Sequence, residues 1–115
     1  MSLEGVRVLL VEDEPIIAMT AEDMLEELGC VVIAAAATLR EALEAVERAD
    51  FDLVLLDINL NGVESHPVAD RLRAAGRPFV FTTGYGRDAA RGAPVIAKPY
   101  RLKDLEAAIA TALGR

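Results

Sequence analysis

The sequence has no tryptophan, one cysteine, three phenylalanines and two tyrosines, so a folded core must be built mainly from aliphatic side chains. Apolar residues nevertheless make up 53% of the 115 residues. Disordered chains have a much lower apolar content, because they cannot bury enough apolar surface to offset the entropy of folding. A chain of this length typically forms one domain, and we expect residues 1–115 to fold as a single unit.

Other absences restrict the function. No apolar run approaches the ~18–20 residues of a transmembrane helix, and no secretory leader is visible. With a net charge of −7 and no run of lysine and arginine, the chain is a poor candidate for binding nucleic acid or an anionic membrane. Cys30 has no second cysteine with which to pair, so we expect no internal disulfide and, by default, a cytoplasmic location.

Two kinds of segment alternate along the chain. Continuous apolar runs, typical of buried strands, occur at Val6–Val11, Val31–Ala36, Leu53–Leu56, Phe79–Phe81 and Val95–Ala97. Between them, apolar residues recur at helical spacing, as in Ile17, Ala21, Met24 and Leu28. Short strands without polar alternation, separated by amphipathic helices, predict a doubly wound α/β domain with a five-stranded parallel sheet.

Capping signals support these helices. Thr38 and Glu41 form a capping-box pattern, Pro67 suits a first helical turn, and Gly29 and Gly76 lie where C-terminal caps are expected. By contrast, the connection "TGYGRDAARGAP" before Val95 holds three glycines and no clear apolar stripe. We therefore predict a fourth helix that is short or disordered.

Polar residues follow four of the apolar runs, at the points where the strands are expected to end. They are Glu12 and Asp13, Asp57 with Asn59, Thr82 and Thr83, and Lys98. In a parallel sheet of this kind, functional sites form beyond the carboxyl ends of the strands, so these side chains are expected to meet. Clustered carboxylates suit Mg²⁺, while an ammonium and a hydroxyl can hold phosphoryl oxygens and a remaining carboxylate can act as a nucleophile.

Each of these residues also has an ordinary structural explanation. A single aspartate after a strand is most often a turn or helix cap, and "EDEP" can be the acidic first turn of a helix that begins at Pro15. Lys98 alone suits a surface lysine, and Thr83 alone suits a turn hydroxyl. The functional hypothesis depends on the joint pattern. Outside it, we expect the sole histidine, His66, at the surface and Cys30 in the core.

The joint pattern resembles the receiver domain of two-component response regulators over essentially the whole chain. The matching residues are the acidic pair Glu12–Asp13, Asp57 with Asn59, Thr83 followed by Gly84, and Lys98–Pro99. The resemblance implies a flavodoxin-like sheet of order 2-1-3-4-5 and Mg²⁺-dependent phosphorylation of Asp57 by a histidine kinase or a histidine phosphotransfer protein.

The resemblance also implies a role for each matching residue. Asp13 and Asp57 would bind Mg²⁺ directly, Asn59 through its backbone carbonyl, and Glu12 largely through water. Thr83 and Lys98 would contact the phosphoryl group, and the Lys98–Pro99 peptide bond would be cis. Signalling would then proceed by binding another, unknown protein or by draining phosphoryl groups from a kinase. The chain would not be an enzyme beyond its own phosphorylation and dephosphorylation.

Several positions depart from the common receiver pattern. The acidic pair is Glu-Asp, the run after Asp57 is "INLNGVES", and Val95 stands where an aromatic residue often rotates on activation. The block "FTTGYG" is similar to a receiver subgroup with a Phe-x-Thr-Gly motif and a reduced fourth helix. Tyr85 is therefore our candidate for relaying phosphorylation to a partner, through a change of order in Gly84–Gly92.

Two alternatives remain open from the sequence. A phosphatase of the haloacid dehalogenase type also uses an aspartate nucleophile after an apolar strand, although on the first strand and with a second acid where Asn59 stands. A degenerate receiver would be an interaction module that is never phosphorylated. Turnover of small phosphomonoesters would favour the first, and absence of phosphotransfer would favour the second.

Overall fold

The structure is a computed structural model that describes residues 3–84 and 94–115. Strands and helices alternate along the chain, as the apolar pattern predicts. In order they are β1 (Arg7–Val11), α1 (Pro15–Glu27), β2 (Val31–Ala36), α2 (Leu39–Arg48), β3 (Leu53–Asp57), β4 (Asn59–Leu60), β5 (Val63–Glu64), α3 (His66–Ala74), β6 (Phe79–Thr83), β7 (Val95–Ala97) and α4 (Leu102–Ala112).

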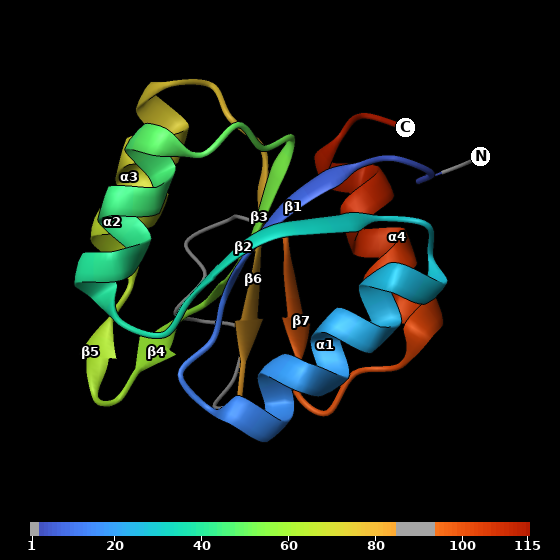
Figure 1. Cartoon of the computed structure of the whole chain (residues 1–115), viewed down its shortest axis with the longest axis horizontal. Coiled ribbons are helices and arrows are strands. Elements are labelled where there is room, and N and C mark those ends of the chain that lie inside the picture. Colours follow the sequence, from blue (N-terminus) through green and yellow to red (C-terminus); the bar gives the residue numbers. More distant parts are fainter. Residues whose placement is uncertain (1–2, 85–93) are drawn as a thin grey trace.

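Five of the strands form one sheet in the order β2-β1-β3-β6-β7, and every neighbouring pair is parallel. Counting only the long strands, this is the order 2-1-3-4-5, so the predicted doubly wound α/β fold is confirmed. Helices α2 and α3 cover one face of the sheet, and α1 and α4 cover the other (Figure 1). The strand order reverses at β1 and β3, whose carboxyl ends carry the acidic residues.

The strands are buried on both faces, which explains their unbroken apolar runs. Alternate residues of β1, β3 and β6 point to opposite helix layers. Those facing α2 and α3 include Leu9, Leu56 and Phe81, whereas those facing α1 and α4 include Leu10 and Leu55. All three phenylalanines lie among the buried residues on the α2 and α3 side. The expectation of an aliphatic core therefore holds for the buried residues on the α1 and α4 side.

The capping predictions are confirmed at α2 and α3. The Thr38 hydroxyl accepts a hydrogen bond from the Glu41 amide at 3.1 Å, and the Glu41 carboxylate accepts one from the Ala37 amide at 2.8 Å. Pro67 lies in the first turn of α3, and Gly76 follows its C-terminus with a φ of +67°. These local signals mark the start of α2 and both ends of α3.

One element was not predicted. Strands β4 and β5 form a small antiparallel hairpin between β3 and α3, with Leu60 paired to Val63. Its two-residue turn is Asn61-Gly62, with φ of +56° and +86°. An Asn-Gly pair between apolar residues is a strong hairpin signal, because both positions of a type I′ turn require positive φ. That signal was present in "INLNGVES" but was not used.

The connection between β6 and β7 was expected to hold a short or disordered fourth helix. Residues 85–93 of this connection, including Tyr85, lie outside the described residues. The proposed relay and the change of order in Gly84–Gly92 therefore stay predictions. Among the helices of the described ranges, none combines the length and apolar character needed to cross a membrane.

Candidate functional site

The carboxyl ends of four parallel strands bring the predicted polar residues together. Asp57 is the last residue of β3 and Thr83 the last residue of β6, while Glu12 and Lys98 follow β1 and β7 directly. Backbone hydrogen bonds extend the sheet past the strand ends: the Glu12 amide donates to the Ala36 carbonyl at 3.0 Å, and the Lys98 amide donates to the Thr83 carbonyl at 2.7 Å. The sheet ladder thus sets the positions of these side chains.

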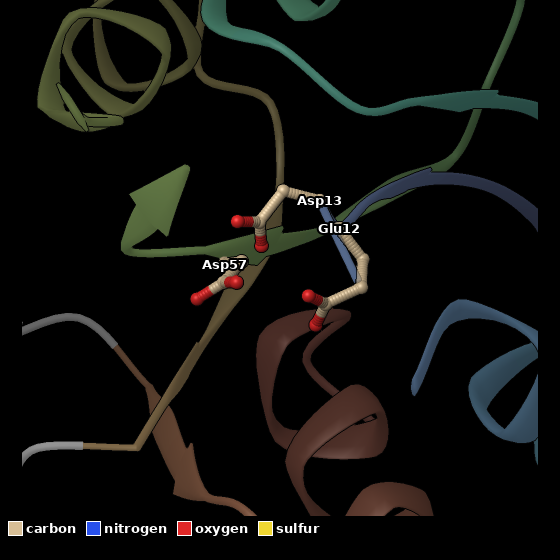
Figure 2. Close-up of side chains that lie close together, drawn as sticks. All are labelled: Glu12, Asp13 and Asp57. Carbon is tan, nitrogen blue, oxygen red and sulfur yellow. The ribbon is translucent and has the colours of Figure 1, made fainter. Parts of the chain in front are cut away.

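Three carboxylates converge at this edge. Glu12, Asp13 and Asp57 each place a carboxylate oxygen within 4.8 Å of the others, as Figure 2 shows. Glu12 and Asp57 are buried, with 6% and 3% of their surface exposed, whereas Asp13 is only partly buried. Buried carboxylates at this separation repel one another unless a cation lies between or beside them.

Lys98 supplies one such cation from the protein itself. Its ammonium donates hydrogen bonds to Glu12 Oε1 and to Asp57 Oδ2, both at 3.0 Å. The Lys98 side chain is only 15% exposed, so these ion pairs are poorly screened by water. The Lys98–Pro99 peptide bond is cis, as the resemblance implied.

The charges of the cluster shift the pKa values of its members. Burial raises the pKa of Glu12 to about 7, against the opposing effect of the Lys98 hydrogen bond. Burial likewise raises the pKa of Asp57, again opposed by Lys98. For Lys98, burial alone would lower the pKa, but hydrogen bonds to Glu12 and Asp57 outweigh it and raise it. A further cation at the site would therefore stabilise the charged forms of Glu12 and Asp57.

Asp13 behaves differently from Glu12. Burial would raise its pKa, but hydrogen bonds from the Glu12 carboxyl group and from the Asn61 amide outweigh burial and lower it. Asp13 Oδ2 accepts the hydrogen bond of the Asn61 amide at 2.9 Å. Asp13 is thus the carboxylate of the cluster that stays anionic most readily.

An open pocket of about 320 Å³ lies over the cluster. It is lined by Asp13, Glu14, Ile17, Asp57, Asn59, Gly84 and Lys98. Two of the three carboxylates, Asp13 and Asp57, line the pocket, whereas Glu12 does not. Anionic oxygens of Asp13 and Asp57, together with Asn59, are hard donors of the kind that Mg²⁺ prefers, so the residues present fit this ion.

The remaining predicted residues are close to the pocket. The Asn59 amide donates to Asp57 Oδ1 at 3.3 Å, and the Ser65 hydroxyl donates to the Asp57 carbonyl oxygen at 2.6 Å. Ser65 was missed by the sequence analysis, because nothing local marks a serine that reaches back to a strand end. Thr83 is buried and directly precedes Gly84, which lines the pocket.

The expectation that His66 lies at the surface is wrong. Its side chain is 6% exposed and packs edge-to-face on Phe81, with ring centroids 5.6 Å apart. His66 begins α3 in the same helical phase as the buried Ala69, so the packing of α3 against the sheet carries it inward. Cys30 is buried, as predicted.

The chain is similar to known proteins over almost its whole length. Residues 8–110 match the response regulator receiver domain family. The phyllosphere-induced regulator PhyR of Methylorubrum extorquens is 37% identical over 116 residues, which cover 92% of this chain and 43% of PhyR. The chain spans about half the length of the curated relatives it matches.

Solved structures show the same fold. SdrG from Sphingomonas melonis Fr1 has a TM-score of 0.84 and 39% identity, covering 95% of this chain and 97% of SdrG. The receiver domain of the sensor histidine kinase PA1611 from Pseudomonas aeruginosa has a TM-score of 0.84 and 26% identity, covering 96% of this chain and 99% of that domain. That structure holds a magnesium ion in its active-site cleft.

Proposed function

Since this chain belongs to the response regulator receiver domain family, we propose that Asp57 accepts a phosphoryl group from a histidine kinase or a histidine phosphotransfer protein in a Mg²⁺-dependent reaction. The observation that carries the proposal is that Asp57 lines a pocket, is paired with the Lys98 ammonium and lies beside a second pocket-lining carboxylate, that of Asp13. This combination suits transfer of a phosphoryl group, whose charge must be neutralised on several sides.

The residues divide the chemistry among them. An Asp57 carboxylate oxygen forms the new P–O bond as the P–N bond of a phosphohistidine breaks, and the bonding electron pair leaves with the imidazole nitrogen. Lys98 neutralises the transferred oxygens, and the Thr83 hydroxyl donates to one of them. Asp13, Asp57 and the Asn59 backbone carbonyl would hold Mg²⁺, which supplies charge neutralisation on the other side, with Glu12 acting largely through water.

The proposal is tested by incubating the protein with a small acyl phosphate and Mg²⁺ and measuring the intact mass. One added phosphoryl group with Mg²⁺, and none after EDTA, is expected. A chain that stays unmodified with every donor would be a degenerate receiver. Steady turnover of small phosphomonoesters would instead indicate a phosphatase, contrary to our proposal that the chain catalyses only its own phosphorylation and dephosphorylation.

Lys98→Ala is expected to slow phosphorylation by roughly 100-fold, the usual cost of removing one preorganised transition-state donor. Mg²⁺ affinity should change little or rise, because the ammonium repels the ion. Phosphorylation is followed by intact mass and Mg²⁺ binding by calorimetry. Lys103→Ala is the matched control, since Lys103 is an exposed lysine on α4. Normal phosphorylation of Lys98→Ala would remove Lys98 from the reaction.

The surface beside the site fits a protein donor. A groove of about 350 Å³ is lined by Ile16, Ile17, Thr20, Met24, Lys98, Pro99 and Tyr100. Ile16 and Met19, both on α1, are 78% and 64% exposed, the most exposed of the large apolar side chains in the described residues. Lys98 lines both this groove and the pocket over Asp57, so a protein seated on α1 would lie next to the phosphoryl acceptor.

Consider a kinase that phosphorylates the wild-type chain. Ile16→Ser is expected to slow phosphotransfer from it about tenfold or more, because full burial of an isoleucine side chain contributes ~1.5–3 kcal/mol to binding. Phosphorylation by a small acyl phosphate, which needs no docking surface, should stay unchanged. Val31→Ser is the control, since Val31 is an exposed apolar residue on the edge strand β2. Equal loss with both donors would show that Ile16 affects the site rather than docking.

Signalling after phosphorylation is proposed to proceed through a downstream protein or by draining phosphoryl groups from a kinase. The net charge of −7 disfavours direct contact with nucleic acid or an anionic membrane. A cytoplasmic location agrees with this role, because phosphotransfer from histidine kinases requires access to their ATP-dependent domains.

A further inference from the structure

The hairpin β4–β5 connects to the site at two separate points. At its base, the Asn59 amide donates to Asp57 Oδ1, and the Ser65 hydroxyl donates to the Asp57 carbonyl oxygen. At its tip, the Asn61 amide donates to Asp13 Oδ2 at 2.9 Å, across 48 residues of sequence. The hairpin therefore links the acceptor Asp57 to Asp13, which lies just beyond the end of the neighbouring strand β1.

Contacts within the hairpin and with the core fix the conformation of its tip. The Asn59 side-chain oxygen accepts a hydrogen bond from the Gly62 amide at 2.7 Å, which links the two ends of the turn. Leu60 is 2% exposed and belongs to the core cluster that includes Leu56 and Phe81. The turn residues Asn61 and Gly62 both have positive φ, a backbone that Asn and Gly adopt more readily than other residues.

We propose that the hairpin tip positions Asp13 for metal binding, through the hydrogen bond from the Asn61 amide to Asp13 Oδ2. A carboxylate on the partly exposed rim of a pocket would otherwise sample several rotamers. With Oδ2 held by the tip, the carboxylate of this pocket-lining residue is oriented. Asn61 is thus a positioning residue that acts through its backbone N–H. This inference rests on the proposed Mg²⁺ site.

The same hydrogen bond couples the metal site to an exposed surface. Val63 is 49% exposed, and Glu64 is exposed as well, so the outer strand of the hairpin faces solvent. Coupling of two sites is reciprocal: if the tip favours metal binding, metal binding must stabilise the tip by the same factor. Mg²⁺ is therefore expected to slow hydrogen exchange of the Asn61 amide.

The first experiment measures Mg²⁺ affinity of the full chain by calorimetry. Replacing the Leu60–Asn61 amide by an ester, with the α-hydroxy analogue of asparagine at position 61, removes the N–H but still allows the positive φ. This variant is expected to weaken Mg²⁺ binding by roughly tenfold, the lower end of the cost of losing a partner that orients a metal ligand. Asn61→Gly keeps the N–H and tolerates the positive φ, so it should bind Mg²⁺ as the wild type does. Val63→Ala is the control, because it alters the hairpin surface without touching Asp13.

A second measurement leaves the hairpin unaltered. In Asp13→Ala, without Mg²⁺, the Asn61 amide should exchange about tenfold or more faster than in the wild type, because its acceptor is gone. Unchanged exchange there, or the ester variant at position 61 binding Mg²⁺ as tightly as the wild type, would overturn the inference alone. Wild-type protein that binds no Mg²⁺ would overturn the proposed function together with it.

Discussion

Asp57→Asn is expected to abolish phosphorylation, leaving the intact mass of the protein unchanged after incubation with an acyl phosphate and Mg²⁺. An amide cannot act as the attacking oxygen nucleophile, and no other described carboxylate combines the same features. Asp57 ends a central strand, lines the pocket and receives hydrogen bonds from Lys98 and the Asn59 amide. Glu12 shares Lys98 but does not line the pocket.

The control for this variant is Asp70→Asn. Asp70 is an exposed aspartate on α3, and its replacement removes the same charge outside the carboxylate cluster. It should be phosphorylated at the wild-type rate. Circular dichroism should show that Asp57→Asn keeps the fold, because removing one carboxylate from a repelling cluster relieves unfavourable charge. Labelling of Asp57→Asn at the wild-type level would place the acceptor elsewhere.

The sequence predicted the sheet well, because its strands are buried on both faces and stand out as unbroken apolar runs. Strands β2 and β7 have the predicted bounds, and β3 and β6 extend beyond their apolar runs to include Asp57 and Thr83. The polar residues directly after the apolar runs were therefore predicted to lie at the strand ends. Because the strands are parallel, these ends lie at the same edge of the sheet. Here local pattern and tertiary structure agree.

What the sequence analysis missed depended on contacts between distant segments. The burial of His66 follows from how α3 packs against β6, which a single residue before a proline does not reveal. The bond from Asn61 to Asp13 likewise joins segments 48 residues apart in sequence. The bond from Ser65 to the Asp57 carbonyl is more local, but it forms only because the hairpin between them folds back. The hairpin itself was visible in the Asn61-Gly62 pair.

The chemistry of the carboxylate cluster was only partly predictable. From the three acids at adjacent strand ends, the sequence analysis predicted that a cation would be bound there. That Lys98 would bridge Glu12 and Asp57, while Asp13 is held by the hairpin instead, required the geometry. The two members of the acidic pair are therefore in different environments although they are neighbours in sequence.

This difference yields the last prediction. Asp13→Asn is expected to weaken Mg²⁺ binding by at least about 100-fold, above the usual range for residues that only orient a ligand. Glu12→Gln should cost roughly tenfold or less, the effect of an indirect partner. Asp13 lines the pocket and forms no ion pair within the described residues, whereas Glu12 is buried and paired with Lys98.

Calorimetric titration with Mg²⁺ separates the two variants, and Glu14→Gln controls for the loss of one negative charge. Glu14 also lines the pocket but is exposed and lies outside the carboxylate cluster, so its replacement should change affinity only slightly. Phosphorylation depends on bound Mg²⁺ in our proposal. At limiting Mg²⁺, labelling by acyl phosphate should therefore fall most in Asp13→Asn, less in Glu12→Gln and least in Glu14→Gln. Equal losses in Asp13→Asn and Glu12→Gln would show that Glu12 reaches the ion as directly as Asp13, and that its pairing with Lys98 breaks when Mg²⁺ binds.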